Sequence, residues 1–218
     1  MLVIPDESGT RKLSPTDISQ FIRLEQCERY LRLRLHERSA GVRFMRDYGV
    51  TPQSIPPLLT RSGASFEEDI TADVARRYPV VNLATGVERT RNREHDNERI
   101  VALAAGLAPG SVVVTFQPRL DVELEGWRVR GDVDVLRLER DADGTLHALI
   151  ADMKSSTSAK VEHRLQVAFY REMLGALLRD ADITHAGVGI AILYRGPAGE
   201  VVAATPEDAE HLAVEGDL

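Results

Sequence analysis

The sequence predicts a mixed fold, α/β or α+β, in which a central mixed sheet is flanked by helices. Three observations predict it: some segments carry apolar residues at helical spacing, others have the composition of strands, and Asp141-Ala142-Asp143-Gly144 is a strong β-hairpin signal. From residue 63 the segments run helix, helix, strand, strand, strand, helix, strand, which suits a sheet covered by helices. With 218 residues, of which 43% are hydrophobic and 28% charged, we expect one ordinary globular domain.

The expected helices carry start signals or a periodic apolar face. The first begins at Ser14, an N-cap residue type, with Pro15 at the first helical position, and runs to about Arg38. A long loop is predicted over residues 41–57. Further helices are predicted over residues 63–78, 91–106 and 161–179.

The expected strands cover residues 111–123, 127–138, 146–154 and 186–194. We therefore divide the single domain of residues 1–218 into three parts. Residues 1–62 form a helical N-terminal extension and loop, residues 63–195 form the core, and residues 196–218 form an acidic C-terminal segment.

The net charge of −7 is unevenly spread and does not exclude a groove for nucleic acid. Residues 11–46 hold nine basic and four acidic side chains, whereas residues 196–218 hold six acids and no Lys or Arg. The longest apolar run, residues 100–108, is too short to cross a bilayer, and the N-terminus has no secretory pattern. One cysteine excludes an internal disulfide framework, so a reducing cytoplasm is expected. There is no glycine-rich phosphate loop, which excludes an ATP-driven motor.

The hairpin carries the first sign of chemistry. Centring its turn near residue 143 sets Asp134 opposite Asp152, and alternation along the strands places Lys154 on the same face. Like charges directly opposite destabilise a sheet unless something neutralises them. A divalent cation would do so, and hard carboxylate oxygens suit Mg²⁺ or Mn²⁺.

The simpler interpretation is two strand-end acids with a salt-bridging lysine, and it would be preferred for an isolated Asp-x-Lys. Here the signal is compound. Only three of the 27 basic residues are lysine, so a lysine inside a strand pattern indicates a need for lysine itself, a compact charge with a shiftable pKa. In addition, Glu67 follows Gly63 by one helical turn, and Gln166 and Tyr170 form a polar pair on one helix face.

These residues form the series Gly63-x-x-x-Glu67, Gly131-x-x-Asp134, Asp152-x-Lys154 and Gln166-x-x-x-Tyr170. The series resembles the RecB-like branch of the PD-(D/E)xK nuclease superfamily. The opening Leu13-Ser14-Pro15-Thr16-Asp17-Ile18, running on to Cys27-Glu28-Arg29-Tyr30, is similar to the first helix of CRISPR-associated exonucleases and helicase-linked nuclease domains of that branch. The resemblance spans about residues 13–194. It implies a restriction-endonuclease-like αβββαβ core over residues 63–195.

The resemblance also implies roles in Mg²⁺- or Mn²⁺-dependent hydrolysis of phosphodiester bonds. Asp134 and Asp152 would hold the metal, assisted by the main-chain carbonyl of Met153. Lys154 would orient or help activate the attacking water and stabilise charge on the phosphate. Glu67 stands where many relatives have His and would be a further metal ligand and catalytic residue. This difference leaves open whether one or two metals bind.

By the same resemblance, Gln166 and Tyr170 would position the active site and the nucleic-acid backbone. The substrate would be DNA, at ends or in single strands, in repair, recombination or CRISPR adaptation, with helicase or CRISPR-adaptation proteins as partners and no membrane. Many relatives bind an iron–sulfur cluster through four cysteines. Cys27 stands where the upstream ligand would be, but with no second cysteine we expect no cluster within this chain, and Cys27 is interpreted as a helix residue packed in the core.

Two alternatives remain at this stage. The chain could be a DNA-binding or assembly module of a larger nuclease complex with a vestigial site, or its substrate could be RNA. The six histidines show no metal-ligand spacing, and we interpret His163, at the start of the Gln-Tyr helix, as solvated surface. Exonuclease or endonuclease action, polarity and oligomeric state stay open.

Overall fold

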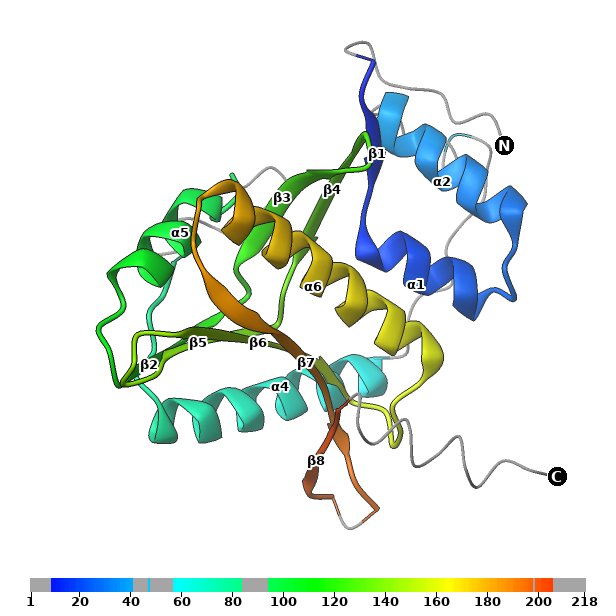
Figure 1. The fold of residues 1–218 in the computed structure, drawn as a ribbon. Helices are drawn as coiled ribbons and strands as arrows, with labels where there is room; N and C mark the ends of the chain where they lie inside the picture. The colour runs from blue at the N-terminus through cyan, green and yellow to red at the C-terminus, as the bar shows by residue number, and fades with distance from the viewer. Residues whose placement is uncertain (1–8, 41–46, 48–56, 84–93, 198, 206–218) are drawn as a thin grey trace, which may run out of the picture.

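The computed structural model describes residues 9–40, 47, 57–83, 94–197 and 199–205 (Figure 1). The mixed fold of helices and strands is confirmed. In chain order the described elements are β1 (Arg11–Leu13), α1 (Pro15–Arg23), α2 (Glu28–Ala40), α4 (Pro57–Arg77), α5 (Asn97–Gly106), β2 (Ser111–Phe116), β3 (Arg119–Leu124), β4 (Trp127–Asp132), β5 (Val135–Arg140), β6 (Leu146–Lys154), α6 (Val161–Asp180), β7 (His185–Arg195) and β8 (Val201–Ala204).

The strands form two sheets, and both are mixed. The larger has the order β2-β5-β6-β7-β8, and the smaller has the order β1-β4-β3. Only β6 and β7 pair in parallel in the larger sheet, and β1 pairs in parallel with β4 in the smaller one. Helix α6 provides the crossover that joins the parallel strands β6 and β7, as such a connection requires (Figure 1).

The two sheets share one bent hairpin, and here the strand prediction is wrong. Residues 111–123 and 127–138 were each expected as one strand, but each is divided into two strands that pair in different sheets. The bend falls at Gln117, which has a φ of 50°, and at Pro118, which has no amide hydrogen to donate. Hydrogen bonds continue across it, since the amide of Gln117 donates to the carbonyl of Asp134 and that of Val133 to the carbonyl of Pro118, both at 3.0 Å. Asp134 therefore lies at the junction of the two sheets.

The turn and register of the β5–β6 hairpin are confirmed. Within the turn, the amide of Asp141 donates to the carbonyl of Thr145, and Gly144 takes a φ of 91° that favours glycine. In the ladder, Val135 pairs with Ala151 and Leu136 with Ile150. Continuing this register by one residue sets Asp134 opposite Asp152.

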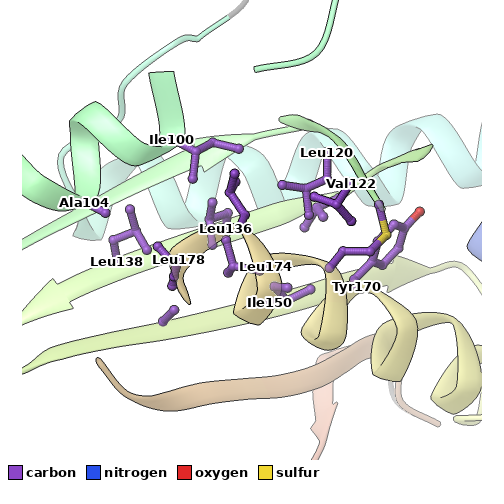
Figure 2. Packing of buried hydrophobic residues seen from close by; sticks show 14 of the residues in the cluster. Ile100, Ala104, Leu120, Val122, Leu136, Leu138, Ile150, Tyr170, Leu174 and Leu178 are labelled. Carbon is purple, nitrogen blue, oxygen red and sulfur yellow. The ribbon is translucent and has the colours of Figure 1, made fainter. Parts of the chain in front are cut away.

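Each face of the larger sheet is covered by a helix. On one face, Leu136, Leu138 and Ile150 pack with Leu174 and Leu178 of α6 in a buried cluster that extends to α5 and the smaller sheet (Figure 2). On the other face, Phe66 and Ile70 of α4 pack with alternate residues of β5, β6 and β7, namely Val135, Ala151, Met153 and Ala191. Side-chain alternation along β6 therefore directs Asp152 and Lys154 toward the α6 face.

The expected single helix from Ser14 to Arg38 is wrong, although its start is confirmed. Ser14 caps α1 through a capping box with Asp17, but the chain leaves the helix after Arg23. The turn contains Glu25 and Gln26 at φ values of 52° and 58°, which let α2 fold back against α1.

The reversal brings two arginines of α2 onto the buried carboxylate of Asp17. Arg34 and Arg38 both form ion pairs with it. Cys27 is exposed within the reversal, so its interpretation as a packed core residue is also wrong. The physical reason is that Cys27 lies between the two helices and not within one.

The remaining differences concern boundaries and short strands. Helix α4 begins at Pro57, before the expected residue 63, and α5 begins at Asn97, after the expected residue 91. The predicted loop over residues 41–57 lies almost wholly outside the described residues, as do residues 91–93. Strands β1 and β8 were not expected, and β8 lies inside the segment interpreted as an acidic end. Among the described residues, no helix combines the length and apolar character needed to cross a membrane.

Candidate active site

The bent hairpin brings two carboxylates together at the edge of the core. Asp152 is 1% exposed on β6, and Asp134 is half-buried at the bend before β5. The Oδ2 atom of Asp134 accepts a hydrogen bond from the amide of Met153 at 2.8 Å. This bond ties the irregular bend to the regular strand β6 and holds Asp134 beside Asp152.

Lys154 provides the positive charge of this group. Its Nζ lies 2.8 Å from Oδ2 of Asp152, an ion pair in which the Oδ2 atom makes no directed hydrogen bond. Burial raises the pKa of Asp152 to about 7; Lys154 opposes the rise, and the nearby carboxylate of Asp134 adds to it. Asp152 therefore holds a proton more tightly than an exposed carboxyl group does, even with Lys154 beside it.

Gln166 and Tyr170 are brought to the same place from α6. Both side chains are buried, and Gln166 Nε2 donates a long hydrogen bond of 3.5 Å to the Tyr170 hydroxyl. Burial and the charge of Asp152 raise the pKa of Tyr170, which keeps its hydroxyl protonated as a donor. Figure 2 shows Tyr170 at one end of the core cluster, with its hydroxyl directed away from the aliphatic side chains.

Gly131 explains how the tyrosine ring fits. A Cβ at this position on β4 would lie 2.6 Å from Cε1 of Tyr170 and 3.1 Å from Cδ of Pro15. The ring thus packs directly on the glycine backbone, with the first residue of α1 on the same spot. The motif predicts the place of Gly131 but not this steric role, because the partner residues are remote in sequence.

Glu67 is the predicted residue that the structure does not bring into the carboxylate pair. It is exposed on α4, one turn after Gly63, where a Cβ would approach the Ser155 hydroxyl at 3.8 Å. This contact places the Gly63 turn of α4 beside the end of β6. Among the described residues, no three His, Cys, Asp or Glu side chains come close enough to share a metal ion.

His163 was interpreted as solvated surface but is half-buried in the first turn of α6. Burial and the positive charge of Lys154 lower its pKa, so the imidazole lies within electrostatic reach of the site. No sequence signal marked this, because the proximity depends on how α6 crosses the sheet.

The donor set fits a hard divalent cation. Burial and the nearby charge of Asp134 raise the proton affinity of Asp152, and a cation can neutralise such a carboxylate as well as a proton can. Asp152 Oδ2 is also a buried acceptor without a directed hydrogen bond. Magnesium is commonly held by one or two carboxylates, with water and substrate phosphate completing the shell. Asp134 and Asp152 together offer carboxylate oxygens of the kind that such an ion takes from a protein.

One comparison with known proteins, the match to a protein family, agrees with this arrangement. The family model of the PD-(D/E)XK nuclease superfamily matches residues 22–215. A comparison with curated proteins finds no match. Among solved structures, one described as "Crystal structure of SSO0001" is similar at 10% identity over 98% of this chain and 76% of that chain, with a TM-score of 0.31. On the family match, which covers most of the chain and both carboxylates, the chain belongs to the PD-(D/E)XK nuclease superfamily.

Proposed function

We propose that this chain is a Mg²⁺- or Mn²⁺-dependent deoxyribonuclease that hydrolyses phosphodiester bonds. The observation that carries the proposal is the group of Asp134, Asp152 and Lys154 on one face of the hairpin, with Lys154 Nζ 2.8 Å from Asp152. Members of the superfamily typically use a divalent metal for this chemistry. Within the superfamily we assign the chain to the RecB-like branch, acting on DNA ends or single strands, because the Gln166–Tyr170 pair lies beside the carboxylates.

The residues take distinct roles in this proposal. Asp134, Asp152 and the Met153 carbonyl would hold the metal, which when bound would lower the pKa of a water molecule and balance charge developing on the phosphate. Lys154 is placed to donate to the attacking water or to a phosphate oxygen, since its ammonium already faces the carboxylates. Gln166 and the protonated Tyr170 supply neutral donors for the substrate backbone. Glu67 would be a further metal ligand and would act from α4 through a bound water molecule.

The first experiment measures cleavage of labelled single- and double-stranded DNA, with RNA of the same sequence beside them, in Mn²⁺ and in EDTA. We expect cleavage in Mn²⁺ only, reduced at least about a hundredfold in Asp152→Asn and in Lys154→Ala. Asp180→Asn and Lys12→Ala are matched controls away from the site and should cleave normally. Melting temperatures of the variants close to that of the wild type would exclude unfolding as the cause of the lost cleavage.

Titration calorimetry with Mn²⁺ on the wild type and on Asp134→Ala separates the function from its alternative. Binding that is lost in the variant together with cleavage supports the nuclease. DNA binding that persists in EDTA, without cleavage under any condition, would instead favour a binding or assembly module in a repair, recombination or CRISPR-adaptation complex.

A further inference from the structure

An apolar groove runs along α6 on the face of the sheet that carries the carboxylates. Its volume is about 220 Å³, and its lining is almost wholly apolar. It is lined by Arg164, Val167, Ile190, Ala191, Ile192, Ala204 and Thr205. The groove is therefore bounded by one helix and by two strands, β7 and β8.

The residues that line the groove are neighbours of the candidate active site in the sheet and on the helix. Asp152 pairs with Ile192 in the β6–β7 ladder, and Ile192 pairs with Ala204 in the β7–β8 ladder. Residues paired across neighbouring strands lie on the same face of a sheet, so Ile192 and Ala204 extend the row that begins at the carboxylate. On the helix side, Val167 directly follows Gln166. A nucleic-acid strand bound at the carboxylates would therefore reach the groove with its next nucleotide.

A cation borders this apolar surface. Arg164 is half-buried, and among the residues that the structure describes its guanidinium has no ion-pair or side-chain hydrogen-bond partner. The charges of Lys154 and Lys160 both reach His163, one residue before it, and Glu162 is the acid that opposes them there. With Arg164 itself, positive charges outnumber negative ones around the first turn of α6. A guanidinium in such a place matches a phosphate oxygen pair well.

An aromatic ring lies on the same face. Tyr194 pairs with Lys154 on one side and with Val202 on the other, and it is half-buried. Its neighbour Arg195 lies over the Phe66 ring on the α4 face, which agrees with the alternation that places Tyr194 on the opposite, active-site face. Aromatic rings beside basic residues are stacking platforms for unpaired bases, and the half-buried Tyr194 leaves part of its surface open for such a contact.

We propose that the groove is a subsite for an unstacked nucleobase of the strand that is cleaved. Arg164 contacts the phosphate attached to that nucleotide, and Tyr194 stacks on the neighbouring base. This inference rests on the proposed function and names its substrate class. Because a base inside a duplex cannot enter a groove in the sheet face, the subsite selects single strands and frayed ends.

The test uses oligonucleotides that lack one base at successive positions. Binding to the full chain is measured by fluorescence anisotropy in EDTA, and kcat/KM by cleavage in Mn²⁺. We expect the wild type to lose about tenfold in affinity for single strands when one particular base, next to the cleaved bond, is missing. Ala204→Leu fills the groove and should weaken binding of the intact single strand by a similar factor, with no further loss from the missing base. Duplex binding should change less than about twofold.

The matched control is Ala203→Leu, the same substitution at the preceding, exposed residue on the other face of β8. It should retain the wild-type dependence on the missing base. Two further comparisons protect against misfolding of one variant. Arg164→Gln should weaken single-strand binding whereas Arg171→Gln, on the exposed side of α6, should not, and Tyr194→Phe should retain the affinity that Tyr194→Leu loses.

Some outcomes overturn the subsite and leave the nuclease intact. Cleavage by the wild type with no dependence on any single base is one such result. Another is an unchanged dependence on the missing base in Ala204→Leu. Absence of both cleavage and DNA binding in the wild type would reject the proposed function itself.

Discussion

At the scale of single residues, the site depends on a position where no side chain fits. Tyr170 is 2% exposed and packs on the backbone of Gly131, with Pro15 on the same spot. The buried ring has no open space to move into, so the glycine fixes where the phenol hydroxyl lies relative to the carboxylates. The hydroxyl can then act as a donor of fixed direction.

Gly131→Ala is expected to destabilise the protein by about 1–3 kcal/mol, since its Cβ would lie 2.6 Å from the buried ring. Urea unfolding measures this change. Gly106→Ala, at the end of α5 with no atom within 4 Å of the added Cβ, is the control and should be neutral or slightly stabilising. Equal stability of the two variants would show that the ring does not pack on Gly131.

At the scale of elements, a buried carboxylate connects α2 to α1. Asp17 is 2% exposed and accepts from the Ser14 amide, from Arg34 and from Arg38. The two arginines come from a helix that the sequence pattern joins to α1. The pairing is possible only because the chain reverses at Glu25 and Gln26.

Asp17→Ala should cost about 3 kcal/mol, because it removes the cap of α1 and leaves two half-buried guanidinium groups without their carboxylate. The comparison is Asp73→Ala on α4, where the acid is 39% exposed and pairs with Arg76 and Arg77. That change should stay within about 0.5 kcal/mol. Chemical denaturation of both variants measures the loss in the free energy of unfolding. Similar losses in the two variants would contradict a stabilising role for the ion pairs of Asp17.

At the scale of the whole molecule, the carboxylate pair links folding to pH. The pKa of Asp152 rises from 3.8 to about 7 on folding, so the folded protein binds this proton more tightly than the unfolded chain. The stabilisation is complete below pH 3.8 and is lost as the pH rises through about 7. At neutral and alkaline pH the metal-free protein therefore loses this stabilisation, mainly because a charged carboxylate is then buried.

Without divalent ions, we expect the free energy of unfolding to fall by about 2 kcal/mol between pH 5 and pH 8. Asp152→Asn should remove most of this slope, while the exposed Asp180→Asn should keep it. Added Mg²⁺ should raise the stability at pH 8 more than at pH 5, because it replaces the proton. Thermal melts across this range measure the effect, and a slope that persists in Asp152→Asn would place its origin elsewhere.

The predictable features of the molecule are the local ones. Asp134 and Asp152 are joined by a short turn whose sequence determines the register, so their position could be derived from alternation alone. The bend at Gln117 could not be predicted, because it depends on two sheets sharing one hairpin. The α1–α2 reversal was hidden for a similar reason, since its stabilising contact joins Asp17 to arginines on the next helix. Glu67 is a different case: the motif identifies the position, but it does not determine whether the side chain reaches the carboxylates.

The tight spot at Gly131 also bears on the order in which the molecule assembles. Asp134 and Asp152 stand 18 positions apart, whereas Pro15 and Gly131 stand 116 apart, so closing the second contact restricts a far longer loop of chain. The pair of carboxylates, Asp134 and Asp152, is thus expected to come together early, in a local hairpin. The N-terminal helix closes over Gly131 afterwards and locks Tyr170 in place. Folding would in this way bring the charged groups of the candidate site together before Tyr170 takes its final position beside them.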